Sequence, residues 1–137
     1  MSKLITIETI PHNRQLYPTA GDYCRDEDGD LHIFVSDTGN PLFNALIGLH
    51  ELVEVMAMER RGIPLQASTD FDLIYEKERE EGKHSESDEP GDDPRSPYLK
   101  EHRLASIVEM LVALDLDVNW DEYGAAVDKL FKNEPLP

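Results

Sequence analysis

The sequence predicts an α+β fold, in which a small N-terminal antiparallel β-hairpin or sheet packs with about four α-helices. Alternation of apolar and polar residues is confined to the first part of the chain, whereas helical spacing and helix-end signals dominate the rest. The length of 137 residues is typical of one domain. We therefore expect a single domain over 1–137, with a β region at 1–38 and a helical region at 41–132.

Two strands and a hairpin are predicted in the β region. Lys3 to Ile10 alternates and ends at Pro11, and Leu31 to Val35 (LHIFV) is rich in apolar and β-branched residues. The Asp-Gly pair within 26–30 is a strong turn signal. The residues just before this turn, Tyr23 and Cys24, would then form a short strand that pairs with LHIFV.

Four helices are predicted after residue 40. The first follows Asn40-Pro41, which has the residue types of an N-cap and a first helical position, and ends at about Arg61, before Gly62. The other three are predicted at about Ser68 or Thr69 to Glu81, Tyr98 to Leu114, and Asn119 or Asp121 to Lys132.

An acidic loop is predicted at 83–97, between the second and third helices. This segment (KHSESDEPGDDPRSP) contains no aliphatic residue and is rich in Pro, Gly, Ser and Asp. A segment of this length without regular structure is usually functional or mobile when it lies inside a compact domain. We expect it to act as a lid over a site and to favour a basic substrate.

Charge and composition exclude several classes of protein. With 13 Lys and Arg against 29 Asp and Glu, the net charge is −16, so the chain would repel the phosphates of nucleic acids and should not bind them directly. The single cysteine, Cys24, excludes a disulfide framework and a cysteine-based zinc site. No signal peptide or membrane span of about 20 apolar residues is recognised. These features predict a soluble, cytoplasmic protein.

Three ionisable residues interrupt an otherwise apolar segment of the first predicted helix. His50, Glu51 and Glu54 lie within ALIGLHELVEVMAM, at positions 45–58, where burial of an unpartnered charge would cost several kcal/mol. His50 and Glu54 are four residues apart and therefore lie on one helical face, where both can bind one ion. A buried His–Glu hydrogen-bond network without a metal is the alternative.

The third helix carries a second pair of such residues on one face, His102 and Glu109. We expect His50, Glu54 and His102 to bind one Zn²⁺, because two His and one carboxylate are typical of catalytic zinc sites. Glu109 would be a fourth ligand or a partner of a ligand. A solvent-exposed polar face is the alternative for Glu109 and His102.

The second helix offers a further candidate ligand. Phe71, Ile74 and Tyr75 are predicted to face the core, which would leave Asp72 and Glu76 on a solvated face. If Asp72 is buried instead, it becomes an extra metal ligand or an acceptor for a ligating histidine.

The segment GLHELVEV resembles the active-site helix of zincin metallopeptidases, including the ImmA/IrrE-type and SprT-like domains. Those helices carry His-Glu-x-x-His, in which both histidines bind zinc and the glutamate acts on the metal-bound water. The resemblance implies that His50 is a ligand and Glu51 the general base. Glu54 stands where those families have the second histidine, and a carboxylate can also bind zinc.

Over most of its length the chain resembles a family of small, uncharacterised phage and prophage proteins. That resemblance implies a location in a host cytoplasm and brings no activity with it. The segments that carry it are TIPHNRQLYPTAGDY, LHIFVSD, LHELVEVMAMERRGI, Phe71-Asp72, EPGDDPRSPYLKEH and LDVNWDEY.

The leading functional prediction is a small metal-dependent hydrolase, a minimal zincin-like metalloprotease whose LHIFV strand offers an edge to a peptide substrate. One alternative is a MazG-like nucleotide pyrophosphohydrolase, in which Glu51 and Glu54, with Glu76 and Glu109, would bind Mg²⁺ or Mn²⁺. The other is a non-enzymatic acidic phage protein that binds a host protein, as an inhibitor or as a mimic of nucleic acid.

Overall fold

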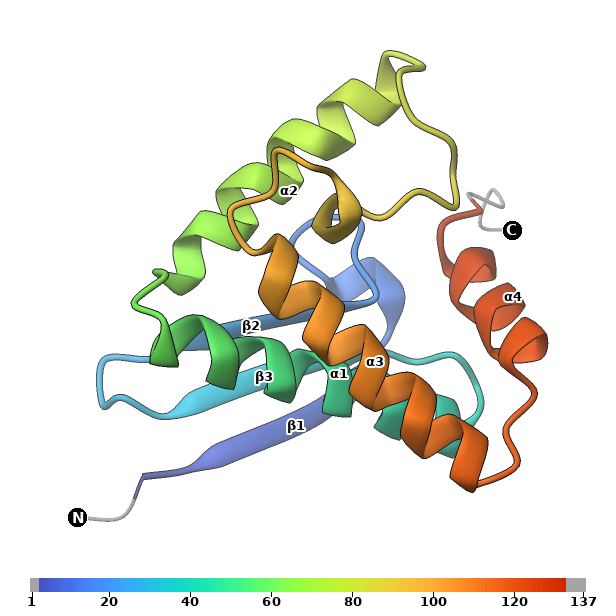
Figure 1. The fold of residues 1–137 in the computed structure, drawn as a ribbon, viewed down its shortest axis with the longest axis horizontal. Helices are drawn as coiled ribbons and strands as arrows, with labels where there is room; N and C mark the ends of the chain where they lie inside the picture. Colours follow the sequence, from blue (N-terminus) through green and yellow to red (C-terminus); the bar gives the residue numbers. More distant parts are fainter. Residues whose placement is uncertain (1–2, 133–137) are drawn as a thin grey trace.

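The computed structural model describes residues 3–132 and has an α+β fold, as predicted (Figure 1). A sheet of three strands, β1 (Ile5–Ile10), β2 (Gly21–Arg25) and β3 (Leu31–Ser36), is covered by α1 (Pro41–Arg60). The chain continues through α2 (Leu65–Glu80), α3 (Leu99–Asp115) and α4 (Trp120–Leu130). Two short 3₁₀ helices, η1 (His12–Arg14) and η2 (Pro90–Asp92), lie in the connections.

The sheet is mixed rather than antiparallel. β2 and β3 form the predicted antiparallel hairpin, whereas β1 pairs with β3 in parallel, with Ile5 opposite Leu31 and Ile7 opposite Ile33. A parallel pair requires a crossover between its strands, and the segment from Pro11 to the end of β2 provides it. The alternating pattern of β1 predicts its faces but carries no information about its direction.

The strand order is β1-β3-β2, so the LHIFV strand is the central strand. Both of its edges are hydrogen-bonded to neighbours, and the prediction that it offers an edge to a peptide is wrong. Within the described residues, β2 is an edge strand of the sheet, and one of its edges is unpaired. It lies beside the acidic side chains of α1.

The helix boundaries follow the predicted signals closely. The side chain of Asn40 caps α1 by accepting hydrogen bonds from the backbone amides of Leu42 and Phe43, and Asn119 caps α4 in the same way. α2 begins at Leu65, a few residues before the predicted start, directly after Pro64 at the N-cap. Ile74 is 56% exposed, so its predicted place in the inward stripe is wrong.

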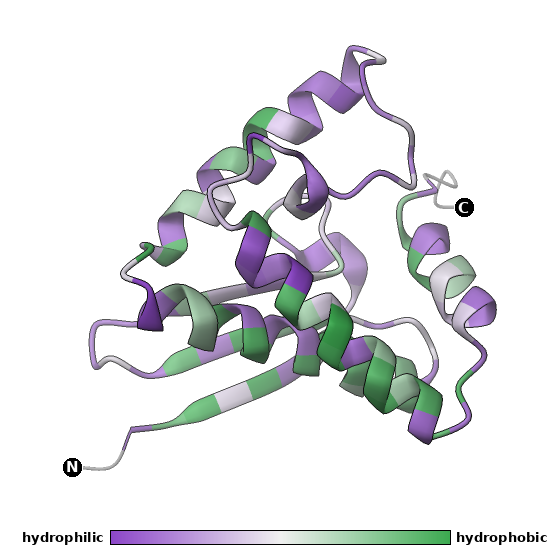
Figure 2. Ribbon diagram, in the orientation of Figure 1, coloured by the Kyte–Doolittle hydropathy of each residue, from purple (hydrophilic) through white to green (hydrophobic). Residues whose placement is uncertain are grey.

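The core lies between the sheet and α1. Leu31, Ile33 and Val35 of β3 are fully buried against apolar side chains of α1, among them Leu46 and Met58. α3 packs on α1, and Figure 2 shows that apolar residues concentrate on these two helices and on the strands, whereas α2 and the loop after it are largely hydrophilic. α1 is therefore enclosed between the sheet and α3.

α1 has the length and apolar composition of a membrane-spanning helix. Within the fold, however, it contributes buried residues to the core and packs against both the sheet and α3. These are the contacts of a helix that forms part of a domain core.

The acidic segment 83–97 is a loop, as predicted, and it packs back onto the domain. The Arg79 guanidinium of α2 donates hydrogen bonds to the carbonyls of Ser85 and Asp88, which holds the first half of the loop. The second half contains η2, and Gly91 within it is buried. The loop thereby reaches the N-terminal end of α3, beside His102.

Candidate metal centre

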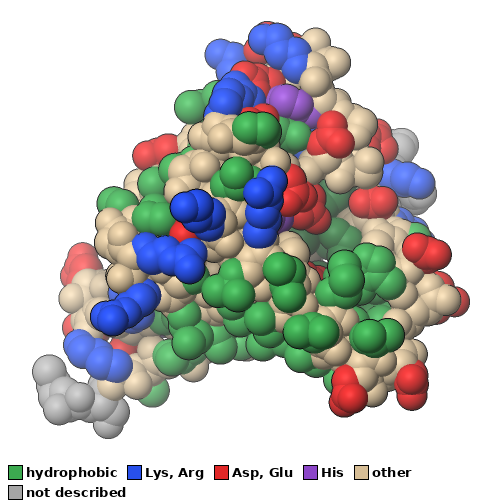
Figure 3. Space-filling view, in the orientation of Figure 1, with side chains coloured by type: hydrophobic (Ala, Val, Ile, Leu, Met, Phe, Trp, Pro, Cys, Tyr) green, Lys and Arg blue, Asp and Glu red, His purple; other side chains and the backbone are tan. Residues whose placement is uncertain are grey.

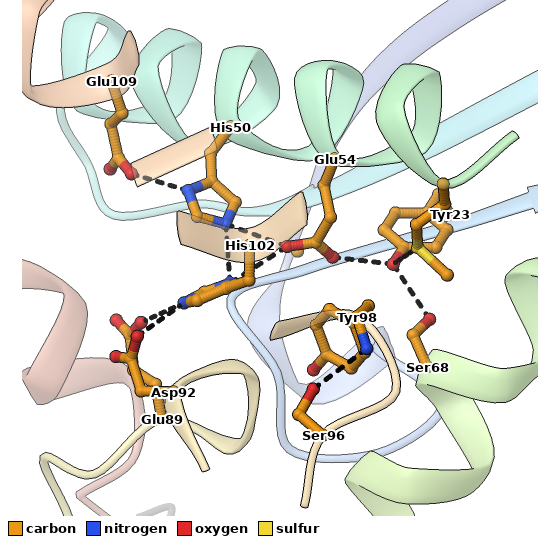
Figure 4. A network of polar contacts seen from close by, with 12 residues as sticks. Tyr23, His50, Glu54, Ser68, Glu89, Asp92, Ser96, Tyr98, His102 and Glu109 are labelled. Carbon is orange, nitrogen blue, oxygen red and sulfur yellow. Dashed lines mark hydrogen bonds and ion pairs between the residues drawn. The ribbon is translucent and has the colours of Figure 1, made fainter. Parts of the chain in front are cut away.

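Three side chains from α1 and α3 converge on one point between these helices (Figure 4). Nε2 of His50 lies 3.2 Å from Oε2 of Glu54 and 3.2 Å from Nδ1 of His102. Nδ1 of His102 lies 3.0 Å from the same Glu54 oxygen. Because His50 and Glu54 are one helical turn apart and α3 packs directly on α1, the fold brings the three predicted ligands together.

The three atoms have the spacing that a zinc ion requires. Zinc bonds to nitrogen and oxygen are about 2.0–2.2 Å long, so two ligand atoms of a tetrahedral zinc ion are about 3.3 Å apart. The sides of the triangle are 3.0–3.2 Å, which is close to that value. All three side chains are buried, and together they can bind a metal ion.

Each of these three side chains also forms a hydrogen bond to a further polar group, on the side away from the centre. Nδ1–H of His50 donates to Glu109 at 2.7 Å, and Nε2–H of His102 donates to Glu89 at 2.9 Å. The outer oxygen of Glu54 accepts a hydrogen bond from the Tyr23 hydroxyl at 2.7 Å. Such partners orient the ligands of metal sites in proteins.

These outer partners determine which ring nitrogens carry hydrogen. A carboxylate can only accept, so each neutral imidazole places its hydrogen on the outer nitrogen and leaves a lone pair on the inner one. The lone pairs of His50 and His102 then point at each other and at an oxygen of Glu54. Three electron-rich atoms at this separation repel one another unless a cation, either a proton or a metal ion, lies among them.

The electrostatics of the site favour positive charge. Burial lowers the pKa of His102, but its hydrogen bonds to Glu54 and Glu89 outweigh burial and raise the pKa to about 10. The pKa of His50 is also raised well above its ordinary value, because hydrogen bonds to Glu109 and Glu54 outweigh the effect of burial. Burial raises the pKa of Glu54, but hydrogen bonds from the two imidazoles outweigh it and lower the pKa to about 2. The surroundings thus stabilise a cation at this point.

Glu51, the predicted general base, lies beside this centre. Its side chain packs against Gly21 of β2, where an added Cβ would lie 2.5 Å from Glu51 Oε1. Burial and the nearby charge of Glu54 raise the pKa of Glu51 well above its ordinary value. Within residues 3–132 no group donates a hydrogen bond to its carboxylate, which lines the cleft.

The centre opens into a cleft of about 470 Å³ between the sheet, the helices and the acidic loop. Aromatic side chains, including Trp120 and Phe131, also line it. Among the lining residues in the described part of the chain, Arg79 is the one Lys or Arg, against eleven carboxylates: Asp22, Glu51, Glu54, Asp72, Glu76, Glu86, Asp88, Glu89, Asp92, Glu109 and Asp128. The cleft therefore favours cationic groups.

Glu109 and Asp72 were both predicted as additional ligands or as partners of ligands. Glu109 accepts hydrogen bonds from His50 Nδ1 and from the Tyr123 hydroxyl, so it is a partner of the predicted ligand His50. Asp72 is buried, and its two oxygens accept hydrogen bonds from the hydroxyls of Tyr17 and Tyr98. The prediction of a solvated face for Asp72 is wrong, because α2 turns this residue toward those tyrosines.

The carboxylates of the MazG-like alternative do not form one group. Glu76 is paired with Arg79 at 3.0 Å, and Glu109 is held by His50 and Tyr123. Of the groups in residues 3–132 with metal-binding spacing, the one that includes Glu54 also contains both histidines. This donor set differs from the all-oxygen sites that Mg²⁺ prefers.

The sequence predicts that the acidic loop lies over a site, but not that residues of the loop contact the imidazole of His102. Glu89 accepts from His102, Asp92 lies 3.6 Å from the same nitrogen, and Gly91 packs against the imidazole ring. An added Cβ on Gly91 would lie 2.3 Å from Cγ of His102. The Pro-Gly pair within the run of acidic residues, just before the third helix, is the sequence signal that marks this close approach.

Replacement of Asp72 by asparagine should change how stability depends on pH. Burial raises the pKa of Asp72 to about 7, although hydrogen bonds from Tyr98 and Tyr17 oppose the shift. Below that pKa the folded protein keeps a proton that the unfolded chain releases above about pH 4. The carboxyl therefore lowers the free energy of unfolding of the wild type as pH rises from about 4 to about 7.

The asparagine variant lacks this ionisation. Its stability relative to the wild type should therefore grow by up to about 1.4 kcal/mol per pH unit between these limits, and stay constant outside them. Urea unfolding of both proteins at several pH values, with a chelator present, measures the difference. Parallel stability curves would contradict the raised pKa.

Comparison of the chain with protein-family models, curated proteins and solved structures gives no match. The resemblances to zincins and to phage proteins therefore stay predictions, and the function is argued from the geometry of the site.

Proposed function

We propose that the protein is a small zinc-dependent hydrolase with a minimal, zincin-like peptidase site. The observation that carries this proposal is the triangle of His50, Glu54 and His102, in which every ligand is oriented by its own outer partner. A buried network without a metal would need a shared proton to relieve the repulsion among the inner atoms. A divalent ion relieves the same repulsion and suits two nitrogens and one oxygen.

When bound, zinc supplies a Lewis acid that lowers the pKa of its water toward about 7. The side chains of the protein supply the rest of the chemistry. Glu51 lines the same cleft, accepts no hydrogen bond from the described residues and has a raised pKa, so it can take a proton from the attacking water. It can then return that proton to the leaving amine.

The cleft also indicates the class of substrate. β2 has an unpaired edge, and Gly21 to Tyr23 of this strand line the cleft, so an extended peptide can add to the sheet there. The carboxylates of the walls favour lysine or arginine side chains in that peptide. We therefore propose basic peptide segments as the substrate.

Elemental analysis of the protein purified without added metal tests the proposal. We expect about one zinc ion per chain, and loss of that zinc in His50→Gln. The matched control is His32→Gln, because His32 lies on β3 and its ring contacts Asp26 and Thr6 rather than the centre. A wild-type protein that stays metal-free after dialysis against zinc, or a His50→Gln variant that retains its zinc, would overturn the metal site.

A further inference from the structure

The outer face of α3 carries an exposed apolar stripe that we define by Leu104, Ile107, Met110, Leu111 and Leu114. Their exposed fractions are 40%, 58%, 49%, 61% and 73%, which is high for side chains of this size. Leu104, Ile107, Leu111 and Leu114 are spaced three, four and three residues apart, which is the spacing of a helix seam that packs on another helix. Exposed apolar surface of this kind marks an interaction site.

The stripe is separate from the metal centre. His102 and Ala105 lie on the opposite side of α3 and are buried against α1, whereas the stripe points away from α1. Figure 3 shows hydrophobic side chains gathered over this face of the molecule, with basic side chains at one side and acidic side chains at the other. A partner on the stripe would therefore leave the cleft lining in place.

The charges at the two ends of the stripe are opposite in sign. Lys100 and Arg103 lie at its N-terminal end, and Asp115 and Asp117 lie at its C-terminal end. If a second α3 packs on the stripe in the reverse direction, its acidic end lies beside the basic end of the first. The same contact is then formed a second time at the other end.

We infer that the α3 stripe joins two copies of this chain in a symmetric dimer with antiparallel α3 helices. About a two-fold axis near the middle of the stripe, Leu104 faces the second copy's Leu114, and Ile107 faces its Leu111. The apolar residues and the terminal charges are then matched at once, as an isologous interface requires. This inference does not depend on the proposed enzymatic function.

The charge pattern favours a second copy over an unrelated partner. A stripe that binds a different protein needs charges that are complementary to that protein. Such a stripe need not be complementary to a second copy of itself that runs in the opposite direction. Here the order basic, apolar, acidic along α3 is complementary to itself when reversed. The large negative net charge of −16 opposes self-association at long range, so the local pairing at both ends has to offset it.

The mass of the full-length protein in solution tests the inference. Sedimentation velocity at several protein concentrations should give the mass of two chains. Leu111→Glu should raise the dissociation constant by more than about 100-fold, because it places a charge in the apolar seam. The control is Ile74→Glu, since Ile74 is 56% exposed on α2, away from the stripe. A single-chain mass at every concentration, or equal dissociation by both variants, would overturn the dimer.

Charge reversal tests the antiparallel direction. A variant with Lys100→Glu and Arg103→Glu, and another with Asp115→Lys and Asp117→Lys, should each dissociate, because like charges then meet at both ends. Mixed together, they should form a heterodimer in which both ends are again attractive. Circular dichroism establishes that each variant is folded. Either charge-reversed variant that stays dimeric by itself, or a mixture of the two folded variants that fails to associate, would contradict the antiparallel arrangement.

Discussion

Replacement of Glu51 by glutamine should strongly slow hydrolysis and leave the zinc content of the protein unchanged. Glutamine has nearly the shape of glutamate but cannot accept the proton of the attacking water. General-base catalysis contributes about 10²–10⁴-fold to a rate, and the variant should lose activity by that factor. Glu51 is not in the group of ligand atoms formed by His50, Glu54 and His102, so metal binding should persist.

The rate is measured by mass spectrometry of a mixture of peptides rich in lysine and arginine. Glu59→Gln is the control, because Glu59 lies on the same helix and pairs with Arg25 on the surface. Gly21→Ala gives a second test, since the three atoms nearest its added Cβ all belong to Glu51 and the carboxylate must move. A wild-type protein that binds zinc but has no activity would contradict the proposed hydrolase activity and would still support the proposed metal site. Equal rates in wild type and Glu51→Gln would contradict the role of Glu51.

Gly91→Ala should weaken zinc binding although Gly91 is not a ligand. Its new Cβ would lie 2.3 Å from Cγ of His102, so either the imidazole or the loop must move. Movement of the ring breaks the triangle, and movement of the loop removes Glu89 from Nε2 of His102. Loss of an outer partner typically costs about 10–100-fold in metal affinity, and we expect at least that effect.

Competition with a coloured chelator measures the affinity of both proteins. Gly124→Ala is the matched control, because Gly124 also lines the cleft but an added Cβ there meets no atom within 4 Å. Alanine in a helix is favoured over glycine by about 1 kcal/mol, so this control should be at least as stable as the wild type. Unchanged affinity in Gly91→Ala would contradict the role of the loop in positioning His102.

The local parts of the centre could be predicted from the sequence. The spacing of His50 and Glu54 within one helix determines their relative position, and the caps Asn40 and Gly62 indicated where that helix lies. His102 was predicted as the third ligand because two histidines and one carboxylate are typical of catalytic zinc sites. Its approach to His50, across 52 residues, depends on how α3 packs on α1, and the structure supplies that contact.

The parts that could not be predicted depend on tertiary contacts. The helical period predicted a solvated face for Asp72. It contains no information about the hydroxyls of Tyr17 and Tyr98, whose hydrogen bonds stabilise the buried carboxyl group. Alternation likewise could not give the direction of β1, since a strand has the same alternation in both directions. The conformation of the loop that carries Glu89 depends on Arg79 and on η2, and neither contact follows a sequence period.

The two histidines of the triangle lie in different halves of the chain, and the loop that supports His102 lies between them. An ion bound by residues of both halves would be a reversible cross-link that stabilises the folded domain. Because this cross-link can form only when both halves are folded together, metal binding and folding would be coupled equilibria. The supply of metal in the surroundings would then set how much of the protein is folded, and how long it survives proteolysis.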